Sequence, residues 1–411
     1  MRHLLIVVLA LVAALALPAA AAAQERERDP FEDARFRFGP LAMTPTLSIS
    51  TLGVDTNVFN EWEDPKRDFT FAAGPQTEAW FRLGRARLHG HGTLEYLYFH
   101  EWASQRGLTA KGDVAFELPL ARIMPYVGIA GADTNARPGF EIDARARYKE
   151  NGRFAGFELR LSPKTSVDLS VRRTKTRFAG DALFMGTYLS EVLDRDTDVA
   201  KATLRFRLTP LTTLVLDADA SKERFVSSPE RDADSVRVMP GFDFDTFALV
   251  SGTVRLGFRR LDMQDESIPD FSGFVGQLKL GYTLLGDTRF DAGFFRDIEY
   301  SFEISQPYYV RTGYEGSITR RIVGGWDVVA RAGQQRLAYR DRGAASPAFV
   351  PGAPRPDGRV DRVETYGGGV GYRFSSGTRV GLDVNQYRRR SDIDTRTYEG
   401  LRAGMVVTYG F

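Results

Sequence analysis

Hydrophobic and polar side chains alternate along much of this chain, most clearly in its last eleven residues. The apolar or aromatic positions there are Leu401, Ala403, Met405, Val407, Tyr409 and Phe411, and the residues between them are Arg402, Gly404, Val406, Thr408 and Gly410. Side chains on a β-strand point to opposite faces with a period of two, so the first set shares one face. The pattern predicts a strand with a continuous apolar face that ends on an aromatic residue.

The same alternation recurs upstream in segments that carry many charges. Residues 86–98, 140–148 and 200–208 each place apolar side chains on one face and mostly charged or polar ones on the other. A charge at every second position is unfavourable in the core of a soluble sandwich. It suits a wall with lipid on one side and water on the other. These segments predict membrane-spanning β-strands.

The connections between the segments come in two kinds. Short turns centre near Gly84, Leu120, Pro163, Pro210, Thr246, Gly286, Ile322 and Ser376. Longer polar connections lie near 54–67, 100–107, 133–139, 178–198, 225–234, 261–272, 297–306, 338–360 and 389–397. Short turns on one rim and long loops on the other are typical of outer-membrane barrels. We expect an all-β protein, a closed antiparallel transmembrane β-barrel of about 18 strands (about 16–20), with short periplasmic turns and longer extracellular loops.

The strand count is least certain between residues 139 and 162. Apolar residues occupy even positions from Phe140 to Tyr148 and odd positions from Ala155 to Leu161, with Asn151 and Gly152 between them. A hairpin turn at that dipeptide would give an odd number of strands. We therefore favour a bulge or an extracellular excursion that shifts the register.

The first residues have the features of a secretory signal peptide. Arg2 and His3 precede an apolar run that ends at Pro18, and three alanines precede Gln24. We expect a signal peptide at 1–23, a flexible periplasmic segment at 24–40 and the barrel at 41–411. The expected location is the outer membrane of a Gram-negative bacterium.

Composition narrows the possible functions. The chain has no cysteine, which removes disulfides and thiolate chemistry. Without residues 1–23 it carries 54 basic and 53 acidic residues, a balance that gives no support to nucleic-acid binding. His89 and His91 share a face, but no third metal ligand and no GxSxG motif are evident. We expect no enzyme activity, no metal and no cofactor.

The face opposite the apolar one would line the lumen. Its basic positions are Arg87, Lys111, Arg145, Arg147, Lys149, Arg160, Arg172, Lys201, Arg205, Arg207, Arg255, Lys279, Arg289, Arg331, Arg379 and Arg402. Its acidic positions are Glu95, Asp113, Glu117, Glu141, Asp143, Glu158, Asp168, Asp217, Asp219, Asp291, Asp327 and Asp383. This mixed, mildly basic lining fits a hydrated conduit with a weak preference for anions. The same charges could instead pair across strands and only brace the wall.

Two of the long loops are candidates for control of the channel. In the loop 178–198, Phe184, Tyr188 and Val192 are four residues apart, which is helical spacing. It is either a short amphipathic helix that gates the mouth or a loop that packs on the barrel rim. The proline-rich loop 338–360 is either a mobile extracellular loop or an inward constriction.

Two features resemble known outer-membrane proteins. The terminal strand, with Tyr409 and Phe411, resembles the C-terminal strand that the barrel-assembly machinery reads in bacterial outer-membrane barrels. The segment 52–59 and the Ser/Thr-Pro-x-Thr turns near Pro163 and Pro210 resemble a β-barrel porin family of Gram-negative bacteria. That resemblance implies a passive exit conduit for an exopolysaccharide. A general diffusion porin and a structural or adhesive barrel are the alternatives.

The same resemblance indicates which partners to expect. They are outer-membrane lipid and lipopolysaccharide, the barrel-assembly machinery, and for an exporter the polysaccharide and periplasmic export proteins.

Overall fold

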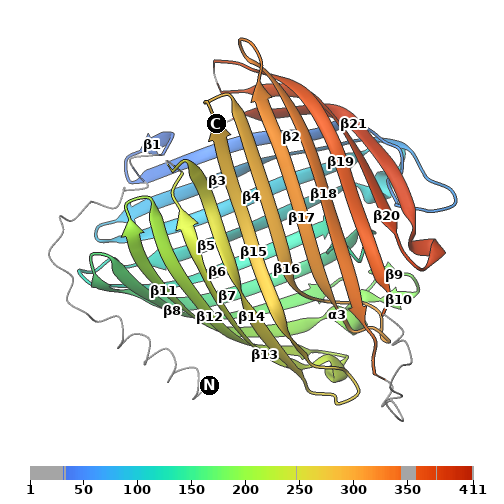
Figure 1. Ribbon diagram of the computed structural model, residues 1–411, viewed down its shortest axis with the longest axis horizontal. Coiled ribbons are helices and arrows are strands. Elements are labelled where there is room, and N and C mark those ends of the chain that lie inside the picture. The colour runs from blue at the N-terminus through green and yellow to red at the C-terminus, as the bar shows by residue number, and fades with distance from the viewer. Residues whose placement is uncertain (1–30, 32–33, 247, 344–357, 376, 410–411) are drawn as a thin grey trace.

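The computed structural model describes residues 31, 34–246, 248–343, 358–375 and 377–409. Eighteen antiparallel strands form a closed barrel (Figure 1). They are β2 (Leu41–Asp55), β3 (Asp68–Leu83), β4 (Ala86–Phe99), β5 (Gly107–Glu117), β6 (Ile123–Ala136), β7 (Ala146–Ser162), β8 (Thr165–Phe178), β11 (Arg195–Thr209), β12 (Thr212–Phe225), β13 (Ala233–Phe244), β14 (Val250–Met263), β15 (Phe271–Leu284), β16 (Thr288–Tyr300), β17 (Tyr308–Arg321), β18 (Trp326–Arg340), β19 (Val360–Arg373), β20 (Arg379–Arg390) and β21 (Tyr398–Tyr409). The predicted fold and its strand number are confirmed.

The barrel closes where its first and last strands meet. β2 pairs with β21 from Leu47↔Tyr409 to Asp55↔Arg402, with one register shift between Ile49 and Leu52. Each strand therefore has a hydrogen-bonded neighbour on both sides, which removes the free edges that an open sheet would expose. The short strand β1 (Phe36–Phe38) folds back on the start of β2, so part of the segment expected to be flexible is paired.

The two rims differ in the length of their connections. The eight connections on the rim where β2 begins and β21 ends, such as 163–164 and 210–211, are short. The nine on the other rim are longer, and they contain the short helix α3 (Leu189–Leu193) and the hairpin of β9 (Leu183–Phe184) and β10 (Thr187–Tyr188). This asymmetry identifies the rim with the long loops as the extracellular one. No helix among the described residues is long and apolar enough to cross a membrane.

β7 differs from the expectation for residues 139–162. It runs without interruption from Ala146 to Ser162 and pairs with β6 and β8 in one register past Asn151 and Gly152. No turn lies at that dipeptide, as expected, but no bulge lies there either. The residues from Phe140 to Ala144 precede the strand, so their alternation is not part of it.

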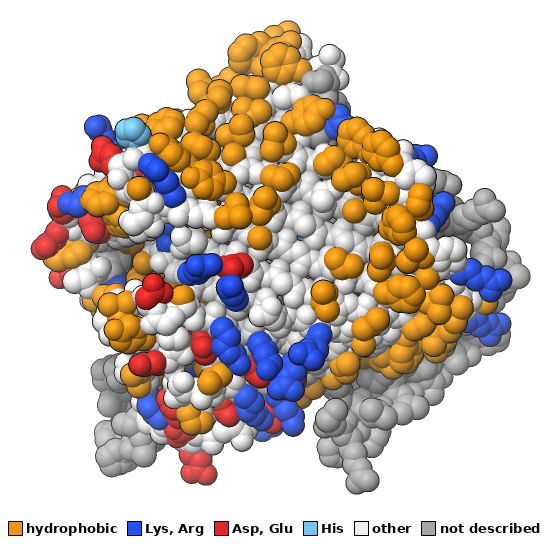
Figure 2. Space-filling view, turned by 180° about the vertical axis from the view of Figure 1, so that it is seen from behind, with side chains coloured by type: hydrophobic (Ala, Val, Ile, Leu, Met, Phe, Trp, Pro, Cys, Tyr) orange, Lys and Arg blue, Asp and Glu red, His pale blue; other side chains and the backbone are white. Residues whose placement is uncertain are grey.

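The wall has an apolar outer face. Paired residues share a face, and the most exposed apolar side chains of the strands, such as Ile129 (67%), Phe258 (69%) and Leu382 (68%), mark the outer one. Figure 2 shows hydrophobic side chains spread over one side of the molecule. The opposite, inward positions carry Arg172 and Lys279, which are exposed although they point into the barrel. A barrel of about 18 strands leaves room for such a hydrated lumen.

Candidate functional site: the extracellular mouth and the lumen

The loop 137–145, which joins β6 to β7, crosses the lumen near its extracellular end. β6 and β7 are the fifth and sixth barrel strands, whereas the loop binds residues of the fourteenth and seventeenth, β17 and β20. Arg389 of β20 donates hydrogen bonds to the carbonyl oxygens of Phe140 (2.8 Å) and Glu141 (3.1 Å) and to Asp143 Oδ2 (2.9 Å). Arg311 of β17 lies over the Phe140 ring, 5.0 Å from its centre. The loop therefore spans the interior instead of leaving the rim.

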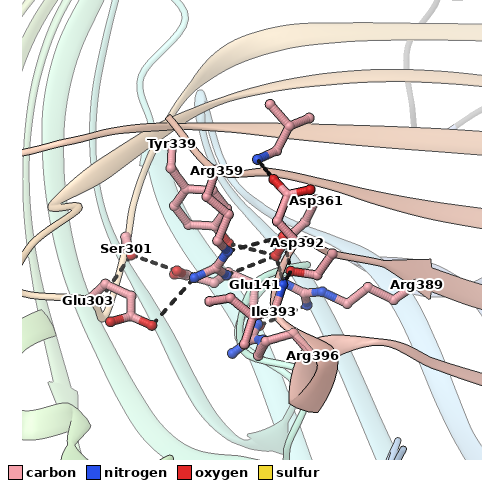
Figure 3. Close-up of polar contacts among 12 residues, drawn as sticks. Glu141, Ser301, Glu303, Tyr339, Arg359, Asp361, Arg389, Asp392, Ile393 and Arg396 are labelled. Atoms are coloured by element: carbon pink, nitrogen blue, oxygen red, sulfur yellow. Dashed lines mark hydrogen bonds and ion pairs between the residues drawn. The ribbon is translucent and has the colours of Figure 1, made fainter. Parts of the chain in front are cut away.

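Glu141 is the most enclosed acidic side chain of this loop. Its side chain accepts hydrogen bonds from Ser301 Oγ (2.6 Å) and the Phe302 backbone N–H (3.1 Å), both in the β16–β17 loop (Figure 3). Arg396, from the β20–β21 loop, donates to the Glu141 backbone oxygen. Burial raises the pKa of Glu141 to about 7, although these hydrogen bonds and nearby arginines favour the charged form.

A second set of buried polar side chains, centred on Asp361, lies on the wall opposite β6 and β7 at the mouth. Asp361 accepts hydrogen bonds from Arg359 (2.8 Å to Oδ2), Ser391 and Arg389 (Figure 3). Arg389 and Asp361 are both completely buried. A buried ion pair needs several partners, because each charge has lost its hydration. Asp361 has such donors, whereas Arg389 Nε is left without a hydrogen-bond partner among the described residues. This network fixes Arg389 in the position from which it donates hydrogen bonds to the loop 137–145.

The β8–β11 loop, 179–194, covers the inserted loop. Leu189, Val192 and Leu193 of α3 are buried and form one apolar cluster with Ile142 and Phe302. The predicted helical spacing thus corresponds to a helix of five residues that follows a two-strand hairpin. Of the two interpretations of this loop, the structure shows the one in which the loop packs at the barrel rim. A gate would require this loop to move.

Three arginines meet where the loop 137–145 leaves and rejoins the wall. Arg137 donates to the Val58 oxygen (3.2 Å), Arg145 lies over the Phe99 ring (4.6 Å), and Arg402 binds Asp55 (2.7 Å). Burial, together with the charge of Arg402, lowers the pKa of Arg137. Burial, with Arg137 and Arg402 adding to it, lowers the pKa of Arg145 to about 10. Arginine keeps its proton in proteins, so the three guanidinium groups beside Asp55 give the cluster an excess of positive charge.

Many of the charges below the mouth pair across strands. Asp217 binds Lys201 and Arg255 (both 2.9 Å), and Arg379 contacts both carboxylate oxygens of Asp327. These inward pairs stabilise the wall and leave little net charge on it.

The wall of β8 and β11 is different. Arg172 stacks on Phe154 at 4.6 Å, and Arg205 and Arg207 have no carboxylate partner among the described residues. The three follow one another from mid-barrel to the periplasmic rim, as the pairing of Arg172 with Val199 and of Ser166 with Arg205 shows. We call these three residues the basic track, and Glu158 and Asp168 lie on the same inward face.

The register decides which predicted site residues face inward. These are Arg87, Lys111, Arg160, Arg172, Lys201, Arg205, Arg207, Arg255, Lys279, Arg289, Arg331, Arg379, Arg402, Glu95, Asp113, Glu117, Glu158, Asp168, Asp217, Asp219, Asp291, Asp327 and Asp383. Arg145, Glu141 and Asp143 lie in the inserted loop, not on a strand.

Arg147 and Lys149 are corrections to the predicted lumen lining. They lie on the same face as the exposed Ile129 and bind Asp133 at 3.5 and 3.1 Å. Their assignment to the lumen rested on the even-numbered apolar positions from Phe140 to Tyr148. Because β7 begins only at Ala146 and has no bulge there, its odd positions face outward along its whole length.

Some important residues escaped the sequence analysis. Arg359, Asp361, Arg389 and Arg396 were not assigned to the site, because the network reaches the loop 137–145 through Arg389 and Arg396, which are far from that loop in the chain. The run of three arginines at 388–390 was the one local signal, because only its middle member points inward.

Three predicted features lie partly or wholly outside the described residues. Tyr409 pairs with Leu47 at the closing seam, whereas Phe411 lies outside the described residues. The signal peptide and most of the loop 338–360 lie outside them as well. In the described part of the chain, no group of three His, Cys, Asp or Glu side chains has the arrangement of a metal site.

The closed barrel, its two unequal rims and the charged lumen define an outer-membrane channel-like protein. The chain belongs to the family described as "Putative beta-barrel porin 2", whose model matches residues 129–411. A comparison with curated proteins found no match.

Solved structures with similarity to the chain are outer-membrane proteins. OpdK from Pseudomonas aeruginosa is 11% identical with a TM-score of 0.47, and 89% of this chain and 98% of that one are covered. A BenF-like porin from Pseudomonas fluorescens is 12% identical with a TM-score of 0.48, and the same shares are covered. The siderophore receptor PirA from Pseudomonas aeruginosa is 10% identical with a TM-score of 0.42, and 89% of this chain and 80% of that one are covered.

Proposed function

We propose that this protein is a passive diffusion channel for small anionic solutes. The observation that carries the proposal is the loop 137–145, which spans the lumen and places Arg137 and Arg145 beside Arg402. Charged side chains at a narrow point act on permeating ions more strongly than charges on a wide wall, because less water screens them. An anion is therefore favoured where it passes the mouth.

The basic track gives such an anion a path toward the periplasm. Arg172, Arg205 and Arg207 follow the mouth along β8 and β11, and most carboxylates of the other walls are occupied by arginine or lysine. No nucleotide-binding motif is present in the sequence, so the solute moves down its own gradient.

The exit of an exopolysaccharide, which the family resemblance implied, gains no support from this arrangement. A polymer would have to pass the loop 137–145, which is tied to the opposite wall by Arg389 and covered by α3. A diffusion channel for small solutes agrees better with a mouth that is crossed by a packed loop.

The test is ion selectivity in planar bilayers. Wild-type protein in a KCl gradient should give a reversal potential that favours chloride. The double variant Arg137→Gln/Arg145→Gln removes two charges from the mouth and should lower the chloride-to-potassium permeability ratio by about threefold or more. The matched control, Arg260→Gln/Arg388→Gln, removes two arginines from the outer face and should leave the ratio unchanged.

Three results would contradict the proposal. One is an unchanged permeability ratio in the mouth variant, which would mean that these arginines do not act on the ions. A second is the loss of surface polysaccharide in a strain that lacks this gene, with restoration by the wild-type gene. That second result would favour the polymer conduit. A barrel that gives no conductance steps at all would favour the structural or adhesive role.

A further inference from the structure

The outer face of β7 and β8 changes abruptly from apolar to basic. From the periplasmic rim toward the extracellular rim, the outward residues of β7 are Leu161, Leu159, Phe157 and Ala155, and the next outward residue is Arg153. On β8 the change falls between Val171 and Arg173. A strand needs about 9–11 residues to cross the hydrocarbon layer, so the first arginines lie where that layer ends and the headgroups of the outer leaflet begin.

On the extracellular side of this boundary, basic side chains outnumber acidic ones. The outward charges of β6, β7, β8 and β11 are the six cations Arg147, Lys149, Arg153, Arg173, Lys175 and Arg177 and the three carboxylates Asp133, Asp196 and Asp198. Figure 2, the face opposite that of Figure 1, shows Lys and Arg side chains gathered in the lower part of the wall beside a hydrophobic area. The local carboxylates cannot neutralise this surface.

Cations also stand directly opposite one another. Arg153 pairs in register with Arg173, and Lys149 pairs with Arg177. Arg153 has no hydrogen bond or ion pair among the described residues, while Arg173 reaches Asp196 at 3.2 Å and Asp198 at 3.6 Å. Like charges opposite each other on neighbouring strands destabilise a sheet. An anion bound between them would remove that repulsion.

An apolar groove lies just below the arginines. Its volume is about 700 Å³, and the outward apolar side chains that line it include Val127, Ala155, Val171, Ala200, Ala220 and Val236. The outward charged residues of its lining are Arg153 and Arg173, with Asp198, Lys222, Asp234 and Asp262 further along. Three of the four neighbouring strands β7, β8, β11 and β12 carry an alanine at this level (Ala155, Ala200 and Ala220), which leaves open a space that bulkier side chains would fill. The groove has the chemistry of an acyl-chain site, and its edge at Arg153 and Arg173 has that of a phosphate site.

We propose that β7, β8 and β11 form a binding site for a phosphorylated glycolipid of the outer leaflet. The guanidinium groups of Arg153 and Arg173 bind its phosphate, since arginine presents two parallel N–H donors to phosphate oxygens. One acyl chain lies in the groove between Val171 and Ala200. The site rests on the outer-membrane location alone and is independent of what passes through the lumen.

A second row of outward arginines has to be distinguished from this site in the binding experiment. Arg336, Arg362 and Arg390 stand side by side on β18, β19 and β20. Bound lipids therefore have to be counted, which native mass spectrometry of the purified full-length chain can do. The probes are bisphosphorylated lipid A, its dephosphorylated form and phosphatidylglycerol.

The expected result has three parts. Wild-type protein retains bisphosphorylated lipid A, and the variant Arg153→Gln/Arg173→Gln binds one molecule fewer or at least about tenfold more weakly. Ala200→Trp, which fills the groove and keeps every charge, has the same effect. The control Arg85→Gln/Arg320→Gln, which removes two exposed arginines near the periplasmic rim, binds as the wild type does.

Other results would overturn the proposal. Unchanged lipid counts in both site variants would show that the surface holds no specific lipid. Equally tight binding of the dephosphorylated form would exclude the phosphate contact, and equally tight binding of phosphatidylglycerol would reduce the site to a general anionic surface. Migration of unheated samples on gels shows that each variant is folded. Should the double variant fail to fold, Arg153→Gln alone removes only a side chain without partners and carries the test.

Discussion

Glu141 is a residue whose protonation is linked to the position of the inserted loop. Its carboxyl is buried against Ser301 and Phe302, and Arg231, Arg359, Arg396, Tyr309 and Tyr339 are the other ionisable groups whose charges couple with it. Burial raises its pKa to about 7, whereas an undocked loop would give it the ordinary value of 4.5. The docked loop thus binds a proton more tightly than the undocked one.

The sign of the pH effect follows from this difference. Between pH 4.5 and 7 the docked state holds more protons, so docking is most favourable below 4.5 and weakens as the pH rises through 7. We predict more frequent opening and a higher mean conductance at pH 8 than at pH 5. Recordings at the two pH values check this.

A matched pair of variants isolates Glu141. Glu141→Gln imitates the protonated carboxyl and should make the conductance nearly independent of pH in this range. Glu303→Gln changes a neighbouring carboxyl that Arg359 reaches at 3.4 Å, and the pH effect should persist. Equal pH dependence in Glu141→Gln and the wild type would assign the effect to another group.

At the scale of elements, α3 stabilises the mouth by covering the loop 137–145. Leu189 is completely buried in the cluster with Ile142 and Phe302, whereas the preceding Tyr188 is 46% exposed. Truncation of a buried leucine to alanine typically destabilises its surroundings by about 2–5 kcal/mol. We predict that Leu189→Ala increases current fluctuations and the rate of proteolysis within residues 137–145.

Tyr188→Ala is the control in the same loop and should resemble the wild type, because it removes an exposed side chain. Deletion of residues 181–194 is the stronger change. If that deletion left conductance and fluctuations as they are, the β8–β11 loop would have no part in controlling the channel.

At the scale of the whole molecule, stability depends on closure between β2 and β21. Gly53 lies at that seam, and a Cβ atom there would come within 2.0 Å of the Ala403 backbone oxygen. Since backbone cannot yield as a side chain can, Gly53→Val should force the two strands apart. We predict destabilisation of about 1–3 kcal/mol and a smaller folded fraction on unheated gels.

Gly92 provides the comparison for the seam. It lies within β4, and a Cβ atom there meets nothing within 4 Å. Gly92→Val should therefore fold as the wild type does. Loss of folding in both variants would point to a general intolerance of valine at strand glycines instead of a closure defect.

The sequence by itself determined the strands, their number and the two kinds of rim. Alternation with a period of two is a property of the strand backbone, and turn residues such as Pro163 and Pro210 act on their immediate neighbours. Information of this kind is local, so it can be read along the chain. The inward direction of the Arg205 and Arg207 side chains can be read from the same local pattern, because their strand has one uninterrupted apolar face.

Only the tertiary structure decided the path of the loop 137–145 across the extracellular mouth. Glu141 is held by Ser301, 160 residues away, and by Arg396, 255 residues away, and no local pattern marks such partners. It also decided the outward direction of Arg147 and Lys149, because the start of β7 is set by its neighbours β6 and β8. Alternation fixes which residues share a face, whereas pairing with adjacent strands fixes where the strand begins and which of its faces meets lipid.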